Sequence, residues 1–171
     1  MLAALASAVP KPAWPQVKSD WERGQGADWK EVEGSLPAFP RAENLVEFKV
    51  SASATFRFFI DAASLSVGED GVVRYVLVAR SPNGVDNVTY EGMRCSTGTY
   101  RIYAAGRNDR TWSPRLQAEW REIEPKTIQR WHQALAREYF CPQSAIIWDA
   151  AEGIDALRRG GHPRKAHSTR D

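Results

Sequence analysis

The sequence has little of what membrane spans and common enzyme sites require. Beyond the first residues, no apolar run approaches the length of a transmembrane helix. The glycine-rich phosphate loop, the G-x-S-x-G turn and the H-E-x-x-H helix are all missing. Two cysteines and three histidines, two of the latter in the C-terminal tail, make a poor zinc site. We therefore expect no cofactor and no metal, and the sequence favours a binding role over an enzyme.

The chain also lacks a net positive charge outside its C-terminus. The 171 residues carry a formal net charge of +2, of which residues 158–171 supply +4 and the rest −2. A folded nucleic-acid-binding face needs clustered lysine and arginine, so nucleic acid is not an expected partner. Residues 159–171 contain no large apolar residue and are expected to form a disordered basic tail. A solubilising role is favoured for this tail, with weak contact to an anionic membrane surface as the alternative.

The chain begins with MLAALASAVP. Residues 1–8 are apolar and end in small residues, as the end of a secretory signal peptide does. The positively charged segment with which a signal peptide normally begins is missing. We interpret residues 1–8 as a signal-peptide remnant, which predicts a periplasmic protein; a frayed alanine-rich terminus is the alternative. Residues 9–44 alternate tryptophan with proline, glycine and charge, which predicts an irregular wrap over the body.

Residues 45–158 are expected to form a single α+β domain. An antiparallel meander of about five or six strands, possibly barrel-like, is predicted by segments rich in β-branched and aromatic residues near 45–51, 55–61, 71–80, 86–95 and 99–105. After Pro125, apolar residues at steps of three or four predict one main C-terminal helix that packs on the sheet and ends at Cys141. A second, shorter helix is expected near 145–157.

The dipeptide Asn83-Gly84 predicts a hairpin loop of two or four residues. That register places Arg74 and Glu91 as diagonal neighbours on the core face, where a structural ion pair is expected. The opposite face would present tyrosines interleaved with arginines, a combination suited to a ligand or partner protein: Tyr75, Tyr90, Arg94, Arg101 and Tyr103. The alternative is that the tryptophan-bearing N-terminal stretch covers this face and turns these residues into ordinary packing.

The two cysteines end a predicted strand and the main helix. In an exported protein, a disulfide between Cys95 and Cys141 is the simplest expectation, and it would tie the helix to the sheet. A reactive Cys95 with His132 as its base stays open as an alternative.

Several blocks occur together in this chain, in the order LPAFP, NLVEFKV, SLSVGEDGVVRYVLVARSPNGVDNVTYEGMRC, YAAGRNDRTW and YFCP. With them, residues 29–142 resemble the CNP1-like family of proteobacterial envelope proteins. The resemblance implies an exported domain with no assigned activity, with Cys95 and Cys141 at the two cysteine positions of the family.

Two functions are consistent with these observations. The first is an exported binding or accessory protein that contacts an envelope complex, the cell wall or a small polar ligand through the tyrosine and arginine face. The second is a small periplasmic hydrolase that uses Arg74, Glu91 and a carboxylate such as Asp61.

Overall fold

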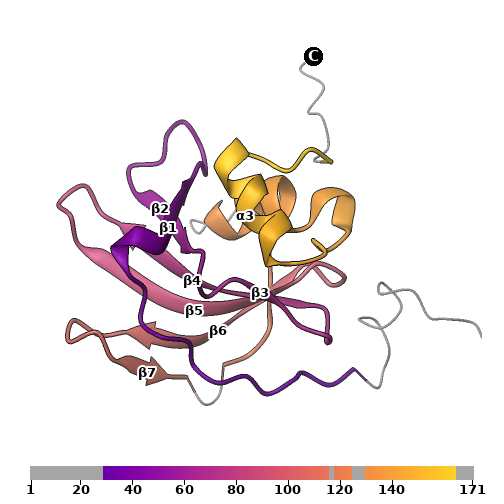
Figure 1. Cartoon of the computed structure of the whole chain (residues 1–171), viewed down its shortest axis with the longest axis horizontal. Helices are drawn as coiled ribbons and strands as arrows, with labels where there is room; N and C mark the ends of the chain where they lie inside the picture. The colour runs from indigo at the N-terminus through magenta and orange to yellow at the C-terminus, as the bar shows by residue number, and fades with distance from the viewer. Residues whose placement is uncertain (1–28, 116–117, 125–129, 165–171) are drawn as a thin grey trace, which may run out of the picture.

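The protein is described by a computed structural model that covers residues 29–115, 118–124 and 130–164. Its centre is an open antiparallel sheet with helices gathered on one side (Figure 1). The strands are β1 (Leu45–Phe48), β2 (Arg57–Asp61), β3 (Ser66–Val67), β4 (Val72–Arg80), β5 (Asp86–Arg94), β6 (Thr99–Gly106), β7 (Trp112–Pro114) and β8 (Arg121–Glu122). The main order is β1-β2-β4-β5-β6-β7, with β3 paired to β4 and β8 to β6. The predicted α+β class and meander are confirmed, and the sheet does not close into a barrel.

The C-terminal part is helical, as its periodicity predicts. Helix α2 (Arg130–Ala134) continues into a π-helical turn, η2 (Leu135–Phe140), which ends at Cys141. The short η1 (Ala42–Asn44) precedes β1, and η3 (Pro142–Ser144) leads towards helix α3 (Ala150–Arg159). Leu135 and Tyr139 are buried in the predicted stripe. No helix in the described ranges is both long and apolar enough to cross a bilayer.

We call the side of the sheet under the helices the helix face. Its core is built from apolar side chains of the long strands and of the helices: Tyr75, Leu77, Met93, Leu135, Tyr139, Phe140, Ile147 and Leu157. Burial of such side chains from water is the main stabilising contribution. The disulfide between Cys95 and Cys141 lies in this core and joins the end of β5 to the end of η2, as predicted.

The hairpin between β4 and β5 differs by one residue from the predicted register. Arg80 pairs with Asp86, and the N–H of Ser81 donates to the carbonyl of Val85, so the loop has three residues. Gly84 lies in the left-handed region at φ 80°, as the last residue of a three-residue loop does. Because side chains alternate along a strand, this single step moves every β4 side chain to the other face.

In the β5–β6 hairpin, Met93 opposes Tyr100 and Arg94 opposes Thr99. A β-bulge then changes the pairing, so that Glu91 opposes Ile102 while Tyr90 opposes Ala104. Simple alternation would place Ala104 on the same face as Ile102, but the bulge turns it to the opposite side, where it packs with Val76 and Tyr90 in a second small core.

That opposite side, which we call the strap face, is crossed by residues 29–40 (the strap), drawn in indigo along one side of the sheet in Figure 1. The strap has no regular secondary structure. It is held by donors from the body: the indole of Trp112 donates to the carbonyl of Pro37 at 2.8 Å, and Arg110 donates to the carbonyl of Pro40. The predicted irregular wrap is thus present over 29–40, whereas residues 1–28, including the signal-peptide interpretation, lie outside the described residues.

The domain extends beyond the predicted boundary at residue 158. Helix α3 ends at Arg159, and Gly160 caps it in the left-handed conformation. His162, expected in a disordered tail, is 3% exposed, and its Nε2 lies 2.9 Å from a carboxylate oxygen of Glu152. This contact orders the chain past the helix because it gives the buried imidazole a partner. Residues 165–171 lie outside the described residues.

Candidate functional site

The five residues of the predicted tyrosine and arginine surface do not share one face. Tyr75 lies on the helix face and is fully buried against Phe140, with ring centroids 5.4 Å apart. Its assignment to a recognition surface is therefore wrong, and the cause is the one-residue difference in register. Burial, together with the nearby carboxylate of Glu91, raises the pKa of Tyr75.

The other four, Tyr90, Arg94, Arg101 and Tyr103, lie on the strap face, where the strap covers them. The carboxylate of Glu31 accepts a hydrogen bond from Arg101 Nη1 at 2.5 Å and another from the Tyr103 hydroxyl. Burial raises the pKa of Tyr103, and this bond raises it further. These side chains contact the N-terminal strap of their own chain. The alternative given in the sequence analysis, that the N-terminal stretch covers this face, therefore applies to them.

Two tryptophans complete the cover. Arg94 stacks on the ring of Trp29, with its guanidinium carbon 3.6 Å from the ring centroid. The indole of Trp120 donates to Glu31, and the indole of Trp29 donates to the carbonyl of Asp70. The strap therefore fills much of this face. A cavity of about 520 Å³ remains between the strap and Arg74, Tyr90, Arg101 and Tyr103, and a larger one lies on the helix face.

The predicted ion pair between Arg74 and Glu91 does not form. Arg74 lies on the strap face, where its Nη2 is 2.6 Å from Asp70 Oδ2 and 3.6 Å from Glu31 Oε1. Burial alone would raise the pKa of Asp70, but hydrogen bonds from Arg74 and from the N–H of Val32 hold it below its ordinary value.

Glu91 points to the helix face. One carboxylate oxygen accepts from the Thr89 hydroxyl at 2.7 Å, and the other lies 2.8 Å from Nε2 of His132. Both members of this pair are almost completely buried, and the imidazole stacks on Tyr100 with centroids 3.7 Å apart. His132 is thus engaged by a carboxylate, and Cys95 is in the disulfide, so the alternative of a Cys95–His132 nucleophile is excluded.

The hydrolase hypothesis required Arg74, Glu91 and Asp61 to converge. Arg74 and Glu91 lie on opposite faces of the sheet and have different partners. Asp61 ends β2 opposite Leu45, where burial raises its pKa. The three residues do not form one site.

The helices leave part of the helix face uncovered, and a trough of about 810 Å³ lies there. One wall is the loop between β1 and β2, and Figure 1 shows this loop and the helices on the same side of the sheet. The trough is lined by Val50, Ser51, Ser53, Ala54, Thr55, Phe56, Phe58, Leu77, Ala79, Asn87, Thr89, Glu91, Ile102, Arg115, Arg130 and Trp131. Its size is within the range of small-molecule sites, and most of its lining surface is apolar.

Three neighbouring aromatic side chains, Phe56, Phe58 and Trp131, line the trough in a row. Phe56 is 38% exposed although it is apolar, and Trp131 packs against Phe58 with centroids 5.4 Å apart. Polar groups come from β5, where Asn87, Thr89 and Glu91 occupy alternate positions, and equally from the loop between β1 and β2. The sequence predicted β5 and its alternation, but the trough was missed because its walls come from segments distant in sequence.

No group of three or more His, Cys, Asp or Glu side chains that could hold a metal ion occurs among residues 29–115, 118–124 and 130–164. The candidate site is the trough, whose lining combines aromatic and aliphatic side chains with polar groups from β5 and from the β1–β2 loop.

Comparisons with known proteins give the chain a family. The model of the CNP1-like family matches residues 24–158. A curated relative, "Cryptic neisserial protein 1" of Neisseria gonorrhoeae (strain ATCC 700825 / FA 1090), is 28% identical over 138 residues, which are 71% of this chain and 68% of the relative. No solved structure matches the chain. Because the family model spans most of the sequence, the chain belongs to the CNP1-like family.

Proposed function

We propose that this protein is an exported binding protein of the bacterial cell envelope, and that it takes an apolar ligand into the trough of the helix face. One observation carries the proposal: an open cavity of about 810 Å³ whose lining is largely apolar and includes an exposed Phe56. Exposed aromatic side chains around a concave surface are typical of ligand sites, since burying them on binding releases water.

Binding fits this cavity better than catalysis. The only carboxylate among its lining residues is Glu91, whose two oxygens are held by Thr89 and His132. Glu91 is 1% exposed, so its carboxylate presents almost no surface to a ligand even though each oxygen keeps a further lone pair. Glu91 therefore stabilises the floor of the trough, and the apolar walls supply the affinity.

Export is supported by the disulfide between Cys95 and Cys141. Disulfides persist in oxidising compartments such as the periplasm and are rare in the reducing cytoplasm. We propose the periplasm as the location on this ground.

Export predicts that both cysteines are oxidised in the cell. Cells of the native host would be fractionated and lysed directly into an alkylating reagent, and the protein mass measured with and without prior reduction. We expect the protein in the periplasmic fraction, with alkylation only after reduction. A cytoplasmic protein with two alkylated thiols before reduction would contradict the proposal.

Ligand binding predicts a specific effect of Phe56→Ser. The neutral dye N-phenyl-1-naphthylamine, whose fluorescence rises in apolar surroundings, would be titrated into the oxidised protein. The variant is expected to weaken dye binding by about tenfold, because one apolar wall is lost.

Trp148→Ser is the matched control, since Trp148 is a 75% exposed aromatic residue outside the trough. It should leave dye affinity within about twofold of the wild type. Dye binding that is undetectable in the wild type, or equally weakened by both variants, would refute the trough as a ligand site.

A further inference from the structure

A smaller hollow of about 290 Å³ adjoins the trough. It is lined by Tyr100, Ile102, Arg115, Ala118, Glu119 and Arg121. Ile102 and Arg115 line both cavities, so the hollow lies directly beside the trough at these residues. The two cavities differ in character: the trough is mostly apolar, whereas two of the six residues of the hollow are arginines.

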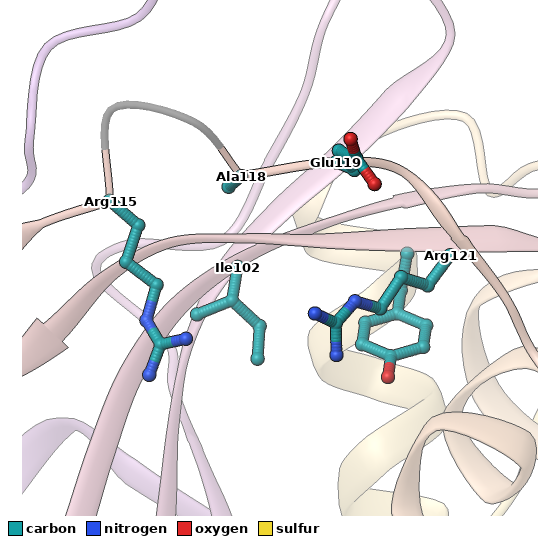
Figure 2. Close-up of a pocket in the computed structure, with 6 residues that line it drawn as sticks. Ile102, Arg115, Ala118, Glu119 and Arg121 are labelled. Carbon is teal, nitrogen blue, oxygen red and sulfur yellow. The ribbon is translucent and has the colours of Figure 1, made fainter.

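Two arginines line this hollow. Arg115 follows β7 and Arg121 opens β8. Figure 2 shows their side chains on either side of Ile102. The carboxylate of Glu119 is set apart from both guanidinium groups in the same view. Within the described part of the chain, neither arginine forms an ion pair.

Unpaired arginines beside an apolar cavity indicate the chemistry of its ligand. A guanidinium group is planar and matches a carboxylate with two parallel hydrogen bonds. Arg130, on the wall of the trough, adds a third positive charge. Two carboxylates also line the two cavities, Glu91 in the trough and Glu119 in the hollow. They are outnumbered by the three arginines, and Glu91 is only 1% exposed.

We propose that the ligand is a single acyl chain ending in a carboxylate: Arg115 and Arg121 hold the carboxylate in the hollow, and the chain lies in the trough between Phe56 and Trp131. This inference rests on the proposed binding function and deepens it by naming the ligand class. Charge complementarity sets the direction of the ligand, since only one end of the combined cavity carries the arginine pair.

The test compares ligands with one chain and different head groups. Decanoate, decanol and decyltrimethylammonium, each below its critical micelle concentration, would compete with N-phenyl-1-naphthylamine for the oxidised full chain. We expect decanoate to bind about tenfold more tightly than decanol and decyltrimethylammonium to bind most weakly, because only decanoate satisfies the arginines. Acetate, which lacks the chain, should not displace the dye.

The double variant Arg115→Gln with Arg121→Gln tests the two residues. Both side chains are exposed, so folding should be unaffected, which a thermal melt would verify. Decanoate affinity is expected to fall about tenfold, to the level of decanol, while decanol affinity is unchanged. Arg158→Gln is the matched control, because Arg158 is exposed on α3 and lines neither cavity.

The outcomes separate the two proposals. Equal affinity of the three decyl ligands, or a double variant that still prefers decanoate, would overturn the carboxylate site and leave the apolar trough intact. A wild type that binds neither the dye nor any decyl ligand would overturn both. Tighter binding of decyltrimethylammonium than of decanoate would also refute the arginine site.

Discussion

Replacement of Cys95 and Cys141 together by alanine is expected to lower the free energy of unfolding by about 4 kcal/mol. The disulfide joins residues separated by 46 positions and restricts the unfolded chain over that length. On the chain-entropy account, a loop of this size gives about that stabilisation. Because small domains have net stabilities of roughly 5–15 kcal/mol, the loss would be a large fraction of the total.

Urea unfolding followed by tryptophan fluorescence would measure this loss. The wild type in the presence of a reductant should unfold at the same urea concentration as the double variant, and the reductant should not affect the variant. A difference below about 1 kcal/mol between oxidised and reduced wild type would contradict the prediction.

Arg74→Met is expected to cost about 3–5 kcal/mol of stability at neutral pH. The substitution keeps the apolar stem but removes the charge that compensates Asp70, whose side chain is fully buried and 2.6 Å from Arg74 Nη2. It also removes the donor to the carbonyl of Val32 and a charge near Glu31, so the strap loses two attachments. A buried carboxylate without its partner carries the full cost of desolvation.

The matched control for Arg74→Met is Arg57→Met. Arg57 and Glu47 form an equally short ion pair on neighbouring strands, but both side chains are largely exposed, at 61% and 46%. An exposed pair contributes about 1 kcal/mol or less, so this variant should be only mildly destabilised. If the two substitutions cost the same in urea unfolding, the buried pair does not hold the strap face together.

The pH dependence of stability provides a second readout of the same pair. The pKa of Asp70 lies below its ordinary value in the folded protein, so its contribution is present above the unfolded value of about 3.9. The contribution is lost as the pH falls through the lower, folded pKa. In Arg74→Met burial is no longer opposed by the guanidinium, so the pKa of Asp70 is expected to lie higher in the folded variant than in the folded wild type. The stability gap between the two proteins should therefore narrow as the pH falls from the higher to the lower of these two pKa values.

The sequence predicted the long strands correctly but not the faces on which the β4 side chains lie. The long strands follow from runs of β-branched and aromatic residues, since alternation along a strand is a local property. The faces of β4 were predicted wrongly because they depend on whether the loop at Asn83-Gly84 has two, three or four residues. Each of these loop lengths is compatible with the same dipeptide. A loop with an odd number of residues places the β4 side chains on the face opposite to the one that a two- or four-residue loop gives them.

The candidate site depends on contacts that no local pattern encodes. Glu31 reaches Arg101 and Tyr103 across about seventy residues, and His132 reaches Glu91 across 41. The two arginines of the hollow are Arg115, which follows β7, and Arg121, which opens β8, and neither of these short strands was predicted from the sequence.

The sequence by itself therefore determined the α+β class, the order of the long strands, the helical C-terminal region, the Cys95–Cys141 disulfide and the CNP1-like family. These follow from local periodicity, from the small number of cysteines and from similarity. Only the tertiary structure decided which face each β4 side chain occupies, which partner each buried charge has, and where a cavity remains open. The physical reason is that register and charge pairing are settled by packing the whole chain at once, when the strap fills one face and the helices leave part of the other uncovered.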